Sequence, residues 1–317
     1  MKKLGMTGLT LALLLTACGE DVAVEDTEET VDESVQEDTE TETGPVTMTD
    51  GMGREVEIPE DPENIIASYL EDYLVALNVT PAAQWSISDG AGVQNYLQDE
   101  LGDVPTIPYD LPYESVLEFS PDLLILRDQP EEDMVSQYSE IAPTYVLESQ
   151  PTNWRGTLLE VGEVLGEEEK AEEVIDAYDQ KAADTSELVS ENAEGESAAA
   201  IWMVDTSLFV VHPERSSGAV LYGDAGFEVP EVVSELSGDA DWAAVSLEEL
   251  AQMDVDRLFF ISDNGDEALS EDRLWQNIPA VENDQVHVFA SDSAWLYYGP
   301  TANEQVLGHI EDSLTND

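Results

Sequence analysis

The chain has 317 residues, of which 42% are hydrophobic, and it is long enough to bury a sizeable core in about two domains. It carries 72 Asp plus Glu against 10 Lys plus Arg, a formal net charge of −62. A surface this acidic repels nucleic acid and anionic membranes, which argues against both as partners. A saline or alkaline extracellular setting is our working hypothesis for the acidity.

Cysteine and histidine usage argues against a metal centre built by the protein. Cys18 is the single cysteine of the sequence, so a disulfide framework and a multi-cysteine metal site are excluded. The histidines at 212, 287 and 309 lack the HxH or HxxxH spacing that brings two imidazoles onto one metal ion. We therefore predict no metal site.

The first 17 residues have the pattern of a signal peptide. Two lysines open the chain, and the apolar segment 9–15 that follows is too short to span a bilayer permanently. The next residues, Leu15-Thr16-Ala17-Cys18, resemble the lipobox of bacterial lipoproteins. The resemblance implies that Cys18 is acylated on sulfur and becomes the mature N-terminus, which would hold the protein on the extracytoplasmic face of the cell membrane. A plain secretory signal with an incidental cysteine is the alternative.

Residues 18–45 have the composition of a disordered acidic tether. Twelve of these residues are acidic, and none is aromatic or basic. Such a segment cannot bury enough apolar surface to fold, and its like charges keep it extended. The segment predicts a flexible link between the membrane and a folded body.

The segment 46–166 predicts an N-terminal α/β lobe. Alternating residues around Asp50-Gly51 predict a hairpin over 46–59. Beyond it, short apolar runs alternate with helical patterns, which is typical of a mainly parallel sheet. The expected strands are 65–67, 82–85, 123–126 and 145–147, and the expected helices are 70–77 and 115–119.

One long amphipathic helix is predicted over 167–191. Apolar residues recur at helical spacing between Ala171 and Val189, and acidic residues occupy most other positions. Taken alone, this pattern also fits an ordinary surface helix.

The segment 192–317 repeats the α/β pattern as a C-terminal lobe, with strands expected at 199–204, 258–261 and 286–289 and helices at 219–222 and 247–252. Two landmarks recur at one offset: Glu114 and Glu248 are 134 residues apart, and so are Asp122 and Asp256. We therefore predict an α/β fold of two equivalent Rossmann-like lobes joined by the long helix.

Five segments resemble the substrate-binding lipoproteins of ABC importers for ferric siderophores, haem and cobalamin. They are 58–81, 113–126, 215–230, 242–261 and 275–289. The resemblance implies a class III periplasmic-binding-protein-like fold: two lobes, a rigid connecting helix and a ligand cleft between the lobes. It also implies a monomer without catalysis or a cofactor of its own, which passes its ligand to a permease with its ATPase.

One pair of residues is carried over from the family as permease contacts. Glu114 and Glu248 match positions at which family members place a Glu that meets arginines of the permease. A carboxylate facing a guanidinium gives a bidentate, salt-sensitive contact suited to repeated docking. The alternative is that both are first-turn helix residues favoured by the helix dipole.

Ligand-binding candidates follow from the rule that ligands collect beyond the carboxyl ends of strands in open α/β sheets. Arg215 also matches an arginine that family members place in the cleft, and Arg155 is a further candidate. Each aromatic residue has packing as its alternative. The candidates are Tyr69, Trp85, Tyr109 and Arg127 in the first lobe, and His212, Arg215, Trp295, Tyr297 and Tyr298 in the second.

The scarcity of basic residues bears on the ligand. Eight Lys and Arg follow the signal segment, which favours a neutral or cationic ferric hydroxamate over a trianionic catecholate complex. Haem or cobalamin is the alternative, with Tyr69 or His212 as an axial ligand of haem. A hydrolase is not favoured because the sequence has no GxSxG or HExxH motif. An adhesion lipoprotein would not require the Glu114 and Glu248 symmetry.

Overall fold

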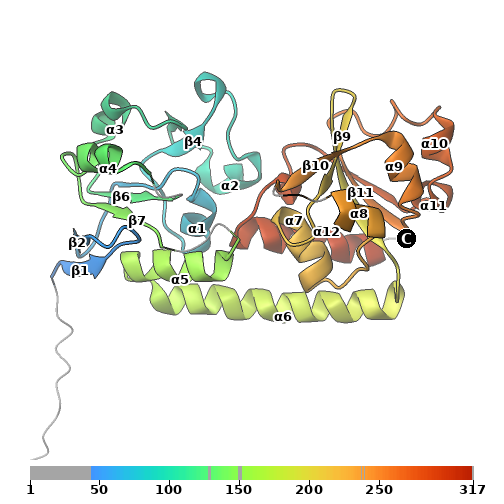
Figure 1. Cartoon of the computed structure of the whole chain (residues 1–317). Coiled ribbons are helices and arrows are strands. Elements are labelled where there is room, and N and C mark those ends of the chain that lie inside the picture. Colours follow the sequence, from blue (N-terminus) through green and yellow to red (C-terminus); the bar gives the residue numbers. More distant parts are fainter. Residues whose placement is uncertain (1–43, 128–129, 149–151, 237, 239, 316–317) are drawn as a thin grey trace, which may run out of the picture. The chain divides into compact units, whose positions relative to one another are not determined.

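A computed structural model describes residues 44–127, 130–148, 152–236, 238 and 240–315. The signal peptide, Cys18 and nearly all of the acidic tether lie outside the described residues. From residue 44 onward the chain builds two α/β lobes, lobe 1 with strands β1 to β7 and lobe 2 with strands β8 to β12 (Figure 1). Within the described part of the chain, no helix has both the length and the apolar character needed to cross a membrane.

Lobe 1 contains the predicted hairpin and short parallel sheets. The hairpin pairs β1 (Val46–Thr49) with β2 (Glu55–Ile58), and a parallel sheet has the order β3-β6-β7. The sheet strands are β3 (Ile65–Ile66), β6 (Leu123–Leu126) and β7 (Thr144–Val146), beside a parallel pair of β4 (Gln84–Ser86) and β5 (Thr106–Pro108). The helices are α1 (Glu71–Ala76), α2 (Gln98–Leu101), α3 (Tyr113–Phe119) and α4 (Glu132–Tyr138), with short 3₁₀ turns η1 (Ser88–Gly90) and η2 (Asn95–Leu97).

Lobe 2 has a mixed sheet of order β10-β9-β8-β11-β12. Its strands are β8 (Ala198–Val204), β9 (Ser207–Val211), β10 (Trp242–Val245), β11 (Arg257–Ile261) and β12 (Val286–Phe289). The expectation of a mainly parallel sheet is wrong here, because β9 pairs antiparallel with both β8 and β10. The reason is the two-residue connection between β8 and β9, where Asp205 has φ 53°, since so short a turn returns the chain antiparallel.

The helical segments of lobe 2 lie around this sheet, and one more helix ends the described chain. They are α7 (Ser216–Gly218), the π-helical η3 (Ala219–Asp224), α8 (Glu231–Leu236), α9 (Leu247–Gln252), α10 (Arg273–Gln276), α11 (Pro279–Glu282), the 3₁₀ turn η4 (Ala294–Leu296) and α12 (Pro300–Thr315).

The predicted long helix is α6 (Glu168–Asn192), which runs beside both lobes (Figure 1). It is preceded by α5 (Trp154–Leu165), a helix that the sequence patterns did not reveal. Gly166 separates the two helices at φ 69°, a left-handed conformation that glycine adopts without strain. The buried side of α6 carries five residues, Ala171, Tyr178, Ala182, Thr185 and Val189.

A single hydrophobic core joins the two lobes. The largest buried cluster begins in lobe 1, includes Trp154 of α5 and Tyr178 of α6, and continues to Phe259 of lobe 2. Alternate residues of β11 divide between cores, so Phe259 faces this cluster and Phe260 faces a second one. Helix α12 falls within the predicted C-terminal lobe, 192–317. It contributes Val306 and Ile310 to the shared core and packs against α6 and α1.

The 134-residue repeat has a structural meaning. Helix α3 and strand β6 of lobe 1 correspond to α9 and β11 of lobe 2, which begin 134 residues later in each case. The Asp122 carboxylate accepts hydrogen bonds from the N–H groups of Glu63 (3.0 Å) and Asn64 (2.9 Å), just before β3. The Asp256 carboxylate likewise accepts one from the N–H of Ser197 (2.9 Å), just before β8. Each aspartate therefore ties together the starts of two neighbouring parallel strands.

Candidate ligand-binding site

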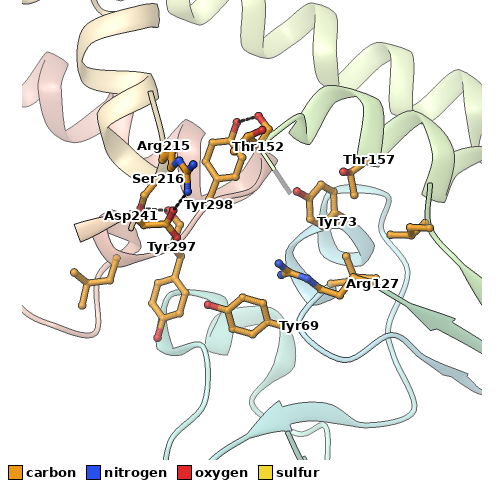
Figure 2. A pocket seen from close by; sticks show the side chains of 13 residues that line it. Tyr69, Tyr73, Arg127, Thr152, Thr157, Arg215, Ser216, Asp241, Tyr297 and Tyr298 are labelled. Atoms are coloured by element: carbon orange, nitrogen blue, oxygen red, sulfur yellow. Dashed lines mark hydrogen bonds and ion pairs between the residues drawn. The ribbon is translucent and has the colours of Figure 1, made fainter. Parts of the chain in front are cut away.

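A cavity of about 370 Å³ lies between the lobes (Figure 2). Lobe 1 and the segment leading into α5 provide one wall, and lobe 2 provides the other. Aromatic or charged side chains make up seven of the thirteen lining residues. The first wall is formed by Tyr69, Leu70, Tyr73, Arg127, Leu147, Thr152 and Thr157, and the second by Arg215, Ser216, Asp241, Leu296, Tyr297 and Tyr298.

The first wall is organised around Tyr69. The Arg127 guanidinium carbon lies 5.1 Å from the centre of the Tyr69 ring, and Trp85 meets the same ring edge-on at 5.1 Å. Such cation–π and edge-to-face contacts hold flat groups in fixed orientations. Tyr69 follows β3 and Arg127 follows β6, and both line the cavity, while their contact with a ligand stays a prediction.

A second cavity of about 380 Å³ adjoins the first within lobe 1. Tyr69 and Arg127 line both cavities, so this pair stands at their common border. Trp85 and Tyr109 line the second cavity only, together with apolar side chains that include Met134. Tyr109 is 63% exposed, which leaves its ring accessible at the cavity rim. The predicted residues of lobe 1 thus gather around two connected spaces.

The second wall carries the other arginine. Arg215 lies 3.8 Å from the Asp241 carboxylate, and both face the cavity (Figure 2). Asp241 precedes β10, so the rule that ligands collect beyond the carboxyl ends of strands does not predict it. Gly218 allows the chain to fold back closely over 212–218, the segment that carries Arg215, since a Cβ there would lie 2.0 Å from the His212 carbonyl oxygen.

Two tyrosines of the second wall contact lobe 1 or its connection to α5. The Tyr297 ring lies 4.7 Å from that of Tyr96, and the Tyr298 hydroxyl donates a 2.8 Å hydrogen bond to the Thr152 carbonyl oxygen. Partial burial raises the pKa of Tyr298 to about 12, and burial raises the pKa of Tyr73 further. Both phenols are therefore protonated at neutral pH. Tyr298 uses its proton in the bond to Thr152 and can accept a hydrogen bond from a ligand, whereas Tyr73 can donate one.

A buried carboxyl group lies beside the first wall. Glu71 is fully buried, and its Oε1 accepts a 2.5 Å hydrogen bond from the Trp85 N–H. Burial raises the pKa of Glu71 to about 7, while hydrogen bonds and the positive charge of Arg127 act in the opposite direction. The sequence analysis missed Glu71, since an acidic residue in a first helical turn is ordinarily exposed.

Three predicted candidates lie elsewhere. Trp295 is fully buried and stacks on Phe259 at 4.8 Å, so it belongs to the shared core. His212 lines neither cavity, and its Nδ1 accepts a 3.0 Å hydrogen bond from the Glu214 N–H. Arg155 stacks over Trp154 at 4.4 Å and pairs with Asp179, which places it where α5 meets α6. A position after a strand was therefore not sufficient to predict that these side chains enter the cavity.

The site offers hydrogen-bond donors and flat apolar surfaces. Two guanidinium groups and four tyrosines line the cavity between the lobes. Among the described residues, no group of three or more His, Cys, Asp or Glu is placed to hold a metal ion. The arrangement suits a bulky ligand with outward-facing oxygen acceptors, which would be bound as an intact complex.

The predicted docking residues occupy equivalent positions. Glu114 is the second residue of α3, Glu248 is the second residue of α9, and both are exposed. Their contact with a permease stays a prediction.

Two α/β lobes, a long connecting helix and a cavity lined from both sides define a two-lobed binding protein. The chain belongs to the periplasmic binding protein family, whose model matches residues 76–292. This confirms the class that the sequence resemblance indicated.

Similar proteins support the same class. The probable siderophore-binding lipoprotein YfiY of Bacillus subtilis is 24% identical over 270 residues, covering 80% of this chain and 82% of YfiY. The iron(3+)-hydroxamate-binding protein FhuD of the same organism is 24% identical over 270 residues, covering 82% of this chain and 84% of FhuD. The structure of FhuD2 from Staphylococcus aureus with bound ferrioxamine B shares the fold, with a TM-score of 0.67 and 19% identity over 80% of this chain and 98% of that chain.

Proposed function

We propose that the protein is a lipid-anchored extracytoplasmic receptor, without a catalytic step, that binds a ferric siderophore and delivers it to an ABC importer permease. The observation that carries the proposal is the cavity between the lobes, with Arg127 on one wall and Arg215 on the other. Guanidinium groups and phenols donate to the oxygen atoms on the surface of a siderophore complex, and the tyrosine faces cover its apolar parts. The relatives named as siderophore and hydroxamate binders add support.

A ferric hydroxamate is the favoured ligand. Asp241 lies 3.8 Å from Arg215 and offsets part of its charge, so the cavity is less cationic than its two arginines suggest. A trianionic catecholate complex would require more positive charge than these groups supply. Haem is less well supported, because Nδ1 of His212 already accepts a backbone hydrogen bond and the Tyr69 ring is held by Arg127 and Trp85.

Tryptophan quenching can test the ligand class, since Trp85 lines the second cavity. We expect ferrioxamine B to bind more tightly than ferric enterobactin. We also expect Arg215→Ala to weaken ferrioxamine B binding by more than about tenfold, because it removes charge-assisted hydrogen bonds. Arg273→Ala is the matched control, since Arg273 is an exposed arginine of α10 that lines neither cavity. A smaller loss in Arg215→Ala, or preference for the catecholate, would contradict the proposal.

Permease docking through Glu114 and Glu248 has its own test. The double alanine variant should bind ligand normally and fail to support uptake, because the receptor would lack the carboxylates proposed to meet permease arginines. The control is the double alanine variant of Glu100 and Glu235, two exposed acidic residues of α2 and α8. Continued uptake by the Glu114 and Glu248 variant would remove these residues from the docking surface.

Membrane attachment rests on the lipobox-like sequence that ends at Cys18. Replacing Cys18 with serine should release the protein from the cell envelope into the medium, because serine cannot form the thioether to lipid. Fractionation of cells that express each form measures this, and retention of the serine variant would argue against a lipid anchor.

A further inference from the structure

A buried acidic side chain of lobe 1 forms a second connection between the lobes, in addition to the connecting helix α6. Asp72 of α1 is 2% exposed and belongs to lobe 1. Its oxygens accept hydrogen bonds from the backbone N–H groups of Thr301 (2.8 Å) and Ala302 (2.9 Å). These are first-turn groups of α12, which have no partner within their own helix. Burial raises the pKa of Asp72, while the hydrogen bonds from Tyr96, Thr301 and Ala302 act in the opposite direction. A side chain of lobe 1 therefore caps a helix that begins directly after the second cavity wall.

A third donor connects the same carboxylate to the cavity. The Tyr96 hydroxyl donates a 2.7 Å hydrogen bond to Asp72 Oδ2, and the Tyr96 ring lies 4.7 Å from the Tyr297 ring. The Gln305 side chain of α12 donates to the Tyr96 carbonyl oxygen at 3.3 Å. Asp72 thus orients the ring against which a cavity-lining tyrosine rests.

Residues that lie close in sequence to Asp72 and to Thr301 line the cavity from opposite sides. Tyr73 follows Asp72 directly and lines the first wall. Tyr298 lies three residues before Thr301 and lines the second wall. Movement of α12 away from Asp72 would therefore shift the second wall relative to the first.

We propose that Asp72 is a positioning residue for ligand binding, which fixes the separation of the two cavity walls by capping α12 from the opposite lobe. The inference deepens the proposed function and rests on it. It adds a second connection between the lobes to the one supplied by α6.

The contact between Asp72 and α12 can also be disrupted from lobe 2, by a substitution at Gly299. A Cβ at Gly299 would lie 2.5 Å from Asp72 Cγ and 2.6 Å from its Oδ1. A methyl group there would push the Asp72 side chain off α12 and leave its carboxyl group present, whereas Asp72→Ala removes that group. Gly299→Ala and Asp72→Ala therefore break the same contact by different means.

The test compares these two variants with Asp50→Ala in the full chain. Asp50 is a matched control because it is also a buried carboxylate that accepts backbone N–H bonds, from Met52 (3.0 Å) and Arg54 (2.9 Å), within lobe 1 alone. The measurements are amide hydrogen exchange over 297–304 and the ferrioxamine B dissociation constant, both at a temperature where circular dichroism shows each variant folded.

We expect Asp72→Ala and Gly299→Ala to speed exchange over 297–304 by about tenfold or more, since the first turn of α12 loses its partner. Both should weaken ferrioxamine B binding by about tenfold, mainly through faster dissociation. Asp50→Ala should change neither measurement, although it lowers stability. Asp72→Asn should restore part of the affinity, because its amide oxygen can still accept one of the backbone bonds.

The inference is overturned if both variants keep wild-type exchange over 297–304, or if exchange rises while affinity stays within about twofold of wild type. Should Asp72→Ala fail to fold, Gly299→Ala decides the question alone. Failure of the proposed function is distinguishable, because wild-type protein would then not bind ferrioxamine B. In that case unchanged amide exchange in both variants would still reject the proposal that Asp72 holds α12 in place, and faster exchange would support it.

Discussion

Replacing Glu71 with glutamine should flatten the dependence of stability on pH between about 4.5 and 7. Glutamine has nearly the same shape and can still accept the 2.5 Å hydrogen bond from the Trp85 N–H, but it does not ionise. The variant therefore removes the titration of one buried carboxyl group and keeps its packing.

The size of the effect follows from the pKa. Burial raises the pKa of Glu71 from 4.5 to about 7. Between these values the folded protein holds a proton that the unfolded chain has released. The resulting stability is fully present below pH 4.5 and is lost as pH rises through 7. At 1.36 kcal/mol per pKa unit the loss is about 3 kcal/mol.

Urea denaturation of wild type and Glu71→Gln from pH 4.5 to 8 measures this loss directly. All other titrating groups are common to both proteins, so the difference between the two unfolding free energies isolates Glu71. It should change by about 3 kcal/mol in favour of the variant as pH rises. Glu118→Gln is the control, because Glu118 is exposed on α3 and should leave the profile unchanged. Parallel profiles for wild type and Glu71→Gln would refute the reasoning.

Three further predictions follow from the core, the cavity wall and the charge. Trp295→Ala should lower the unfolding free energy, measured by urea denaturation, by about 3–5 kcal/mol because the ring is fully buried. An unchanged unfolding free energy would contradict the place of Trp295 in the core. Gly218→Ala should weaken ferrioxamine B binding in fluorescence titrations. The added Cβ would lie 2.0 Å from the His212 carbonyl oxygen and displace the wall that carries Arg215. Wild-type affinity in this variant would show that the wall tolerates the change. Added sodium chloride should raise the midpoint of thermal unfolding, because it screens repulsion within a chain of formal charge −62. A midpoint that does not change with salt concentration would count against that repulsion.

Elements with strong local patterns could be predicted from the sequence. Strand β6 was located because its four apolar residues are buried on both faces, which leaves a continuous hydrophobic run. Helix α6 was found because its length allows the helical period to repeat many times. The repeated Asp122 and Asp256 were recognised by spacing alone, and the structure explains them as ties between strand starts.

Features that depend on distant partners escaped prediction. Asp72 and Thr301 are 229 residues apart, so neither position indicates by itself that a helix of one lobe is capped from the other. Trp295 was misplaced because a strand-end position brings a residue to the edge of a sheet, whereas the following 3₁₀ turn decides whether the side chain enters the cavity or the core. Asp241 comes close to Arg215 through the pairing of β10 with β9, which the sequence patterns did not indicate.

The composition of α6 determines how the protein can be attached to a surface. Lys170 and Lys181 are the lysines that follow the signal segment, both lie on α6, and their side chains are 33% and 29% exposed. None of the residues that line the two cavities belongs to this helix. Amine-coupling reagents that react with lysine would therefore bind the folded protein through α6 and leave the cleft clear. Receptor that is coupled to a sensor chip through these two lysines would keep its cleft open to ligand from solution.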